Sequence, residues 1–264
     1  MHSDSAPEKI LVRAANWVGD AVMSLPAVRA VRERYPASYI AVLAKPWVAD
    51  LYTRESSIDA LIPYPAARGV KDVAGKLRVA RRIAREQFDC AILLPNAFEA
   101  ALVAWLARIP RRIGYSRDAR GFLLTDAVAV PKQDEIPPHQ RYYYLELLRR
   151  AGVLVSLPAV PSIELEGAAQ ARKAGASRFG EFEMPERVIG VSPGAAYGSA
   201  KRWLPERFAE AAARLATGAR AGVAVFGSPG ERALCETVAA AVRSHGVQAL
   251  NLAGKTSLGQ FIEL

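Results

Sequence analysis

Asp20 is the first residue of this sequence whose position suits it for chemistry. It closes the segment Asn-Trp-Val-Gly-Asp at residues 16–20, which follows an apolar run at residues 10–12 and precedes a helical pattern ending near Tyr35. Ligands of open α/β sheets bind beyond the carboxyl ends of the strands, so a carboxylate in the turn after a first strand can meet a ligand. Gly19 permits close approach of another backbone, and the first turn of a helix stabilises a carboxylate. An aspartate here is also a common helix N-cap, so both roles stay open.

A second group of candidates lies in a long loop of the second half of the chain. Residues 192–203 read SPGAAYGSAKRW and separate a predicted strand from a helix that opens at Pro205. Backbone N–H groups of such a loop can bind a diphosphate, and the Lys201 ammonium can neutralise its charge. An ordinary long loop is the alternative. The candidate donor contacts in this loop are Ser192, Gly194, Ala195 and Lys201.

Glycine-containing loops also follow the next two predicted strands. A glutamate in the first turn of a helix after the strand at 222–226 suits hydrogen bonds to ribose hydroxyls, although the helix dipole alone favours it there. The Gly-Lys-Thr at residues 254–256 is not a Walker loop, because an alanine stands where that motif needs its first glycine. No Gly-x-Gly-x-x-Gly follows any strand, which weakens a dehydrogenase interpretation. The candidate donor contacts in these loops are Gly227, Ser228, Glu231, Gly254 and Thr256.

The first half of the chain holds further polar candidates. Asn96 follows a buried strand, where forming a turn is its alternative role. The segment at residues 109–121 carries arginines at positions 111, 112, 117 and 120, which could bind phosphate or carboxylate groups or form a solvated rim. Three adjacent tyrosines at residues 142–144 point in three directions on a predicted helix, so at most two can line one pocket.

The elements that must position these residues alternate between strand and helix. Strands are predicted at residues 9–13, 39–44, 60–62, 89–94, near Leu123 and near Val128, and helices at 21–35, 46–54, 70–86, 99–108 and 137–151. This alternation predicts a parallel sheet. Proline and small residues at 155–163 indicate a linker, after which a helix at 167–179 and strands at 188–191, 222–226 and 248–252 follow. The sequence therefore predicts an α/β protein with two domains, residues 1–160 and 161–264.

Composition limits the class of protein. The 264 residues are 51% hydrophobic and carry a formal net charge of +9 with a pI near 9.8, which favours anionic partners. Cys90 and Cys235 lie in apolar patterns and predict neither a disulfide nor a zinc site. The first eight residues are polar, and no apolar run is long enough to span a membrane, so we expect a cytoplasmic protein, at most peripheral to a membrane.

Six segments together resemble the heptosyltransferase family of lipopolysaccharide core synthesis, and within it the members that add the second heptose. They are residues 16–20 with 24–26, 94–98, 192–195, 200–203, 226–228 and 251–256, and they span nearly the whole chain in order. The resemblance implies two Rossmann-like domains (the GT-B glycosyltransferase fold) and inversion at the anomeric carbon. It also implies an ADP-heptose donor held by the second domain and an anionic lipopolysaccharide inner-core acceptor, built on lipid A, held by the first.

The resemblance assigns the general base to Asp20 and a contact with the donor diphosphate to Lys201. Inverting transfer needs such a base and a positive charge to stabilise the departing diphosphate. No Asp-x-Asp occurs, so no metal and no other cofactor is expected. The basic pI fits attraction to the anionic face of the inner membrane. The candidate acceptor contacts are Asn16, Trp17, Asn96, Arg112 and Arg120.

Two other function classes stay open. A nucleotide- or ADP-sugar-binding protein without transferase activity would keep the second-domain loops and not need Asp20, and a nucleic-acid binder would explain the charge but not the loops. In the family further segments follow the last one matched here, whereas this sequence stops at Leu264, soon after a capping-box pattern formed by Ser257 and Gln260. We therefore expect a truncated heptosyltransferase whose first domain folds normally, whose second domain is marginally stable, and which transfers sugar very poorly or not at all.

Overall fold

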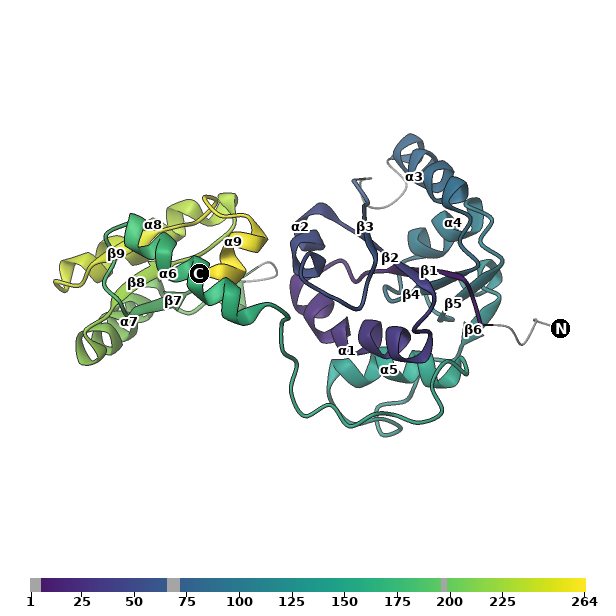
Figure 1. Cartoon of the computed structure of the whole chain (residues 1–264). Coiled ribbons are helices and arrows are strands. Elements are labelled where there is room, and N and C mark those ends of the chain that lie inside the picture. The colour runs from purple at the N-terminus through teal and green to yellow at the C-terminus, as the bar shows by residue number, and fades with distance from the viewer. Residues whose placement is uncertain (1–5, 66–71, 196–198) are drawn as a thin grey trace. The chain divides into compact units, whose positions relative to one another are not determined.

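The chain folds into two compact units, Met1–Glu166 and Gly167–Leu264 (Figure 1). The structure is a computed structural model that describes residues 6–65, 72–195 and 199–264. The sequence places the boundary after residue 160, and the difference has a physical cause. Arg29 Nη2 donates to the carbonyl of Glu164 at 2.8 Å, and the Glu166 carboxylate accepts from the Ser56 backbone N–H at 2.7 Å, so this segment packs with the first unit.

The first unit is built on a parallel sheet of six strands. They are β1 (Lys9–Arg13), β2 (Tyr39–Ala44), β3 (Ala60–Pro63), β4 (Cys90–Leu93), β5 (Arg111–Tyr115) and β6 (Asp126–Val128), in the spatial order β3-β2-β1-β4-β5-β6. This is the strand order of a Rossmann sheet, and the order reverses between β1 and β4. Because both strands run in the same direction, the turns that follow them meet at one edge of the sheet.

Helices cover both faces of this sheet (Figure 1). On one face α1 (Val18–Arg34) packs with α5 (Gln140–Arg150), and on the other α3 (Val73–Glu86) packs with α4 (Phe98–Leu106). The short α2 (Pro46–Ala49) follows β2. Strands covered on both faces are near-continuously apolar, as the sequences of β1, β2 and β4 are. Core side chains from α3, α4 and the sheet include Val79, Ile83, Ala101, Ala104, Leu11 and Leu93.

The basic segment at residues 109–121 departs from the prediction. It contains β5, whereas strands were predicted only near Leu123 and Val128, and Leu123 ends a 3₁₀ turn, Gly121–Leu123. Two arginines hide the strand pattern of β5, and the structure shows what satisfies one of them: Arg111 Nη2 lies 2.9 Å from an Asp126 carboxylate oxygen on β6. The helix predicted at 70–86 begins at Val73, because Asp72 is its N-cap and accepts from the Gly75 N–H at 2.8 Å; residues 70 and 71 of the predicted helix lie outside the described part of the chain.

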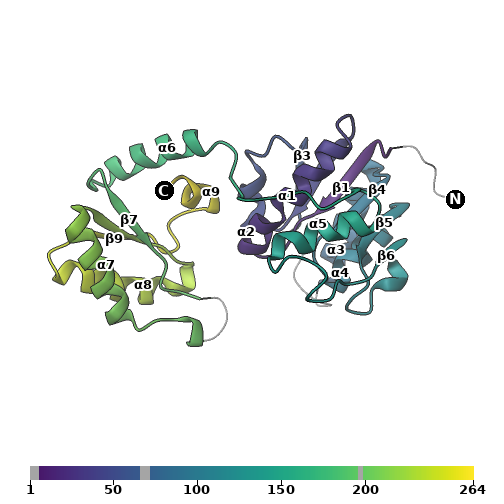
Figure 2. The ribbon, with the colours of Figure 1, turned by 90° about the horizontal axis from the view of Figure 1, so that it is seen from below.

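The second unit is built on a parallel sheet of three strands, β7 (Val188–Val191), β8 (Gly222–Val225) and β9 (Ala249–Asn251), in that order. Figure 2 shows α7 (Pro205–Ala219) and α8 (Arg232–Ser244) on one side of this sheet and α6 (Ala168–Glu181) and α9 (Leu258–Glu263) on the other. The predicted capping box is confirmed, because Ser257 Oγ accepts from the Gln260 N–H at 3.2 Å and Gln260 Oε1 from the Ser257 N–H at 2.9 Å.

Both cysteines are buried in the cores, Cys90 in β4 and Cys235 in α8, as their apolar surroundings predict. Within residues 6–65, 72–195 and 199–264, no helix is both long and apolar enough to cross a lipid bilayer.

Candidate active site

A cavity of about 220 Å³ opens at the carboxyl edge of the first sheet, where the strand order reverses between β1 and β4. Four predicted site residues line it from two segments that are far apart in sequence. Asn16 and Trp17 come from the turn after β1, Asp20 from the first turn of α1 that follows it, and Asn96 from the turn after β4. The remaining lining residues are Ala15, Leu94, Pro95, Ala97, Gln140, Tyr143 and Tyr144.

Asp20 is the ionisable group of this cavity that is best placed to act as a base. It is the third residue of α1, and the N-cap position belongs to Trp17, so the alternative that Asp20 is the helix cap is wrong. Among the described residues its carboxylate has no hydrogen-bond or ion-pair partner, and partial burial raises its pKa above the usual value. A carboxylate with free lone pairs, a raised pKa and access to a cavity can accept a proton from a bound hydroxyl.

Asn16 is fixed by two groups that the sequence analysis missed. Arg13, the last residue of β1, is almost fully buried and donates from Nη2 to Asn16 Oδ1 at 2.6 Å. Trp47 Nε1 donates to the Asn16 carbonyl at 2.7 Å. Burial lowers the pKa of Arg13 to about 10, so its guanidinium stays protonated at neutral pH. The signal in the sequence was Arg13, a charged residue at the end of an apolar strand. In the structure it holds Asn16 in place.

Asn96 does more than form a turn. Its Nδ2 donates to the Tyr143 hydroxyl at 2.9 Å, which ties the turn after β4 to α5. Arg120 supports the same turn from behind: it is fully buried, and its guanidinium donates to the carbonyls of Pro95 and, at 2.9 Å, Tyr115. Burial lowers the pKa of Arg120 to about 10. The structure therefore places Arg120 behind the cavity wall and leaves no exposed guanidinium for a ligand.

Arg112 is not brought to the cavity. It is the second residue of β5, and its Nε donates to the Leu123 carbonyl at 2.7 Å, while Nη1 donates to the Ile109 carbonyl. These carbonyls belong to the loops that lead into β5 and β6, whereas the cavity lies where β1 and β4 end. Of the four arginines in this segment only Arg117 is exposed, so neither a phosphate grip nor a solvated rim describes the segment as a whole.

Helix α5 supplies one wall of the cavity through Gln140, Tyr143 and Tyr144. Two of the three adjacent tyrosines line the cavity, as the helical geometry predicts, and Tyr142 lies beside Arg141 instead. Asp20 and Tyr144 line the same cavity, and the negative charge of Asp20 adds to the larger effect of burial in raising the pKa of Tyr144.

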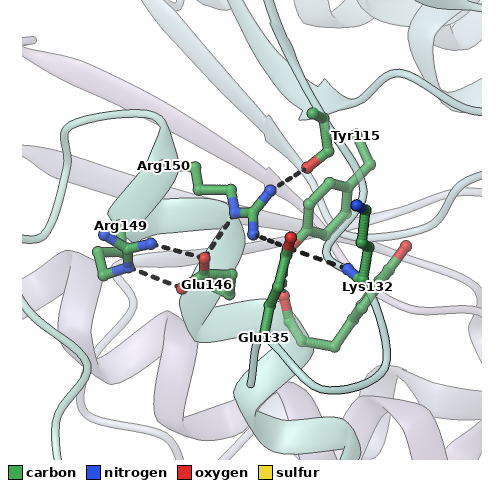
Figure 3. Close-up of polar contacts among 8 residues, drawn as sticks. Tyr115, Lys132, Glu135, Glu146, Arg149 and Arg150 are labelled. Carbon is green, nitrogen blue, oxygen red and sulfur yellow. Dashed lines mark hydrogen bonds and ion pairs between the residues drawn. The ribbon is translucent and has the colours of Figure 1, made fainter.

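Ion pairs within α5 and contacts with neighbouring segments hold this helix (Figure 3). The buried Glu146 carboxylate accepts from Arg149 Nε at 2.7 Å and from Arg150 Nε at 2.5 Å, and Arg150 also pairs with Glu135 in the segment before the helix. The bond from Arg149, followed by that from Arg150, holds the pKa of Glu146 below its usual value despite burial. Tyr115 on β5 donates to the Tyr143 carbonyl at 2.7 Å. The i, i+3 and i, i+4 spacing of Glu146, Arg149 and Arg150 was a local signal for these pairs, whereas the contacts of Glu135 and Tyr115 with α5 have no counterpart in the local sequence.

In the second unit the three predicted donor loops meet at the carboxyl edge of the sheet. The Gly254 N–H donates to the Gly227 carbonyl at 2.9 Å, and Gly254 adopts a φ of +68°, which suits glycine. A Cβ added at Gly194 would lie 2.0 Å from Glu231 Oε1, and one added at Gly254 would lie 2.8 Å from the Cα of Pro229. These loops can approach each other closely only because they lack side chains at these positions.

Glu231 holds the loop after β8 in shape. Its Oε2 accepts from the Ser228 N–H at 2.8 Å and from Ser228 Oγ at 2.7 Å. Both bonds lower the pKa of Glu231, so it is ionised at neutral pH. The carboxylate predicted to meet ribose hydroxyls therefore has one oxygen engaged within its own loop, while the other lies against Gly194.

Lys201 ends the 3₁₀ turn Ser199–Lys201 and is exposed, with no ion pair or hydrogen bond to any described residue. Its neighbour Arg202 donates from Nη2 to the Ala195 carbonyl at 3.1 Å. Ser192 and Thr256 lie in the loops after β7 and β9 and are at least partly exposed. Residues 196–198 of the predicted phosphate loop lie outside the described part of the chain.

No three His, Cys, Asp or Glu side chains among the described residues are arranged to hold a metal ion. The carboxyl edge of the first sheet thus carries a partly buried carboxylate without a partner among the described residues, and that of the second carries an exposed lysine beside glycine-containing loops.

Comparison with known proteins identifies the family. The pattern of "Glycosyltransferase family 9 (heptosyltransferase)" matches residues 76–264. The chain belongs to glycosyltransferase family 9. Among its relatives, lipopolysaccharide heptosyltransferase 2 of Salmonella typhimurium is 32% identical over 260 residues, which cover 97% of this chain and 74% of the relative. The enzyme of the same name from Escherichia coli K12 is 31% identical over the same shares.

Solved structures agree with the heptosyltransferase assignment. The structure of E. coli ADP-heptose LPS heptosyltransferase II aligns with a TM-score of 0.80 at 30% identity, over 97% of this chain and 76% of that one. E. coli heptosyltransferase WaaC with ADP-2-deoxy-2-fluoro heptose aligns with a TM-score of 0.72 at 16% identity, which shows a common fold. The predicted resemblance, the α/β architecture of two Rossmann-like units and the GT-B fold are confirmed.

Proposed function

We propose that this family 9 glycosyltransferase transfers a heptose from ADP-heptose to an anionic sugar acceptor of the lipopolysaccharide inner core, with inversion at the anomeric carbon. The observation that carries the proposal is the Asp20 carboxylate, which lines a cavity without a partner among the described residues and has a raised pKa. Membership of a heptosyltransferase family supports the sugar, and relatives named for transfer to lipopolysaccharide support the acceptor.

In this proposal the first unit binds the acceptor. Asn16, Trp17 and Asn96 contact the acceptor sugar in the cavity, and Tyr143 and Gln140 complete its wall. Arg120 acts as a positioning residue, because its contacts hold the turn that carries Asn96. Arg112 is not included, since its guanidinium is engaged by carbonyls elsewhere.

The second unit binds the donor. The loops after β7, β8 and β9 lie at the carboxyl edge of the sheet, where an anion is favoured, and the exposed Lys201 provides a positive charge. Ser228 and Glu231 stiffen the middle loop through their two hydrogen bonds.

In the proposed reaction one proton moves to Asp20 and one electron pair leaves with ADP. Asp20 takes the proton of the acceptor hydroxyl as its oxygen forms the new bond to the anomeric carbon of the heptose. The bond from that carbon to the diphosphate breaks on the opposite side, and ADP leaves with the electron pair. Lys201 and the loop amides stabilise the charge that develops on ADP. No metal is required in this scheme, so a chelator should not change the rate.

The acceptor of such an enzyme is anchored in a membrane by its lipid, so we propose that the protein works at the cytoplasmic face of the inner membrane and binds it peripherally. The formal net charge of +9 supports attraction to an anionic surface.

Two measurements with the whole chain test the proposal. ADP should raise the melting temperature, and mixing with ADP-heptose and a core acceptor should release ADP and yield a product of inverted anomeric configuration. Binding of ADP without any release on adding acceptor would favour the alternative, a nucleotide- or ADP-sugar-binding protein without transferase activity. Retention on DNA without ADP binding would overturn both.

A further inference from the structure

Helix α3 presents an unbroken stripe of arginines on its outer side. Its buried face is formed by residues at helical spacing, among them Gly75, Val79 and Ile83, which fixes the orientation of the helix on the sheet. The opposite face carries Arg78, Arg81, Arg82 and Arg85, all exposed, at the i, i+3, i+4 and i+7 spacing of one helix side. With Ala74 and Leu77 these four side chains line a shallow hollow of about 550 Å³.

The stripe has no negative partner within the described ranges. None of its four guanidinium groups forms an ion pair or a hydrogen bond there, whereas arginines elsewhere in this unit, such as Arg29, Arg111 and Arg150, pair with carboxylates. Four adjacent like charges repel one another, so this arrangement lowers stability unless an anionic surface meets it.

The neighbouring helix presents exposed apolar groups. Phe98 and Trp105 lie at the i and i+7 spacing of one side of α4 and are 40% and 49% exposed, and Leu102 between them is partly buried against the core. Phe122, which is 77% exposed, lies beside Phe98 with the ring centroids 6.2 Å apart. Figure 1 shows α3 and α4 side by side on the same face of the sheet.

We propose that this basic and aromatic surface, formed by α3, α4 and Phe122, docks the protein on an anionic lipid bilayer. Arginines next to exposed aromatic rings are the combination that binds the charged headgroup region of a membrane, because the cations meet lipid phosphates while the rings enter the interface. A polyanion such as DNA would meet the arginines but would leave the aromatic groups in water. The proposal rests on the proposed function only in that a lipid-anchored acceptor gives the docking a purpose.

The first test is flotation of the whole chain with vesicles of phosphatidylcholine that contain phosphatidylglycerol. We expect binding that weakens as salt rises, and none to pure phosphatidylcholine. The variant R78E/R81E/R82E/R85E should lose at least about tenfold in binding, since each basic residue near such a surface contributes about fivefold. The matched control R172E/K173E/R187E/R214E places four substitutions on exposed cations of the second unit and also lowers the net charge from +9 to +1.

The outcomes separate the alternatives. Equal loss in both variants would show that net charge alone acts, and wild-type binding by the α3 variant would exclude this helix; either overturns the proposal. The variant R78Q/R81Q/R82Q/R85Q serves if the glutamate variant unfolds, because glutamine is also a good helix former. It should bind vesicles weakly too, and normal binding by it would overturn the proposal. Equal competition by duplex DNA and by anionic vesicles, with no change in tryptophan fluorescence, would instead indicate a nucleic-acid surface.

Tryptophan fluorescence tests the aromatic part of this surface separately. Vesicles should shift the tryptophan emission to the blue, and Trp105→Phe should reduce that shift, whereas Trp203→Phe in the second unit should leave it. An unchanged shift in Trp105→Phe would remove α4 from the surface. The α3 variant should still transfer heptose to an acceptor stripped of its acyl chains. Failure of transfer with every acceptor would count against the proposed function. The docking surface is decided by the flotation experiment alone.

Discussion

The carboxyl edges of the two sheets differ in the chemical groups that form them. In the first unit the edge is lined by side chains that are held by buried ionisable groups, such as Arg13 behind Asn16 and Arg120 behind the turn after β4. In the second unit the edge is made of glycine-containing loops that touch one another, with an exposed Lys201 beside them. A base must be partly removed from water to have a raised pKa, whereas a diphosphate is bound by many backbone amides and one flexible cation.

Asp20→Asn should have the largest effect, because it tests whether the first unit supplies the catalytic base. The amide cannot accept the proton, so turnover should fall by roughly 10²–10⁴, the contribution of a general base, while ADP affinity is unchanged. ADP release with saturating donor and acceptor measures the rate, and calorimetry measures ADP affinity. Near-normal turnover would show that the first unit does not supply the base.

Lys201→Ala tests the other half of the comparison. Removing a cation that bonds to a diphosphate should weaken ADP binding by about ten- to a hundredfold, since a hydrogen bond between charged groups is lost. Lys201→Arg is the control, because it keeps the charge. Unchanged ADP affinity in the alanine variant would place Lys201 outside the donor site and leave the loop amides as the whole anion site.

Gly194→Ala tests whether close packing of the loops matters. The new Cβ would lie 2.0 Å from Glu231 Oε1, so the glutamate must move and its bonds to Ser228 are strained or broken. We expect ADP binding about five- to tenfold weaker. Gly218→Ala in α7, where a Cβ would meet nothing within 4 Å, should leave ADP binding unchanged and raise the melting temperature slightly. The same ADP affinity in both variants would show that the loops tolerate a side chain at residue 194.

The smallest expected effects concern pH. Because burial raises the pKa of Asp20, the rate should fall with decreasing pH through a value above the usual range for aspartate, and this limb reports the folded protein. A raised pKa also means that ionisation of Asp20 costs stability, a cost absent at low pH and present at neutral pH. Asp20→Asn should therefore melt no lower than the parent at neutral pH. A melting temperature that drops on substitution would indicate that the carboxylate stabilises the helix N-terminus instead.

Local patterns were sufficient for much of this protein. Apolar strands, helix caps and glycine-containing turns predicted the two α/β halves, and five of the six strands of the first sheet have counterparts among the predicted ones, although Leu123 lies in a 3₁₀ turn. The strand β5 was missed because its two arginines break the apolar pattern, and only the neighbouring Asp126 and loop carbonyls make a strand there acceptable. The positions of Asp20 and Lys201 followed from motifs whose spacing is local.

The tertiary structure alone decided which of the predicted polar residues share a site. Asn96 joins Asp20 because β4 pairs with β1, and Arg112 does not because its side chain reaches carbonyls at another part of the sheet. Tyr143 and Tyr144 enter the cavity because α5 packs on α1 and Tyr115 of β5 donates to the Tyr143 carbonyl. Burial and long-range hydrogen bonding depend on which strands become neighbours, and the type of a residue does not tell which strands these are. The sequence can therefore indicate the chemistry of a side chain but not the groups that it will contact.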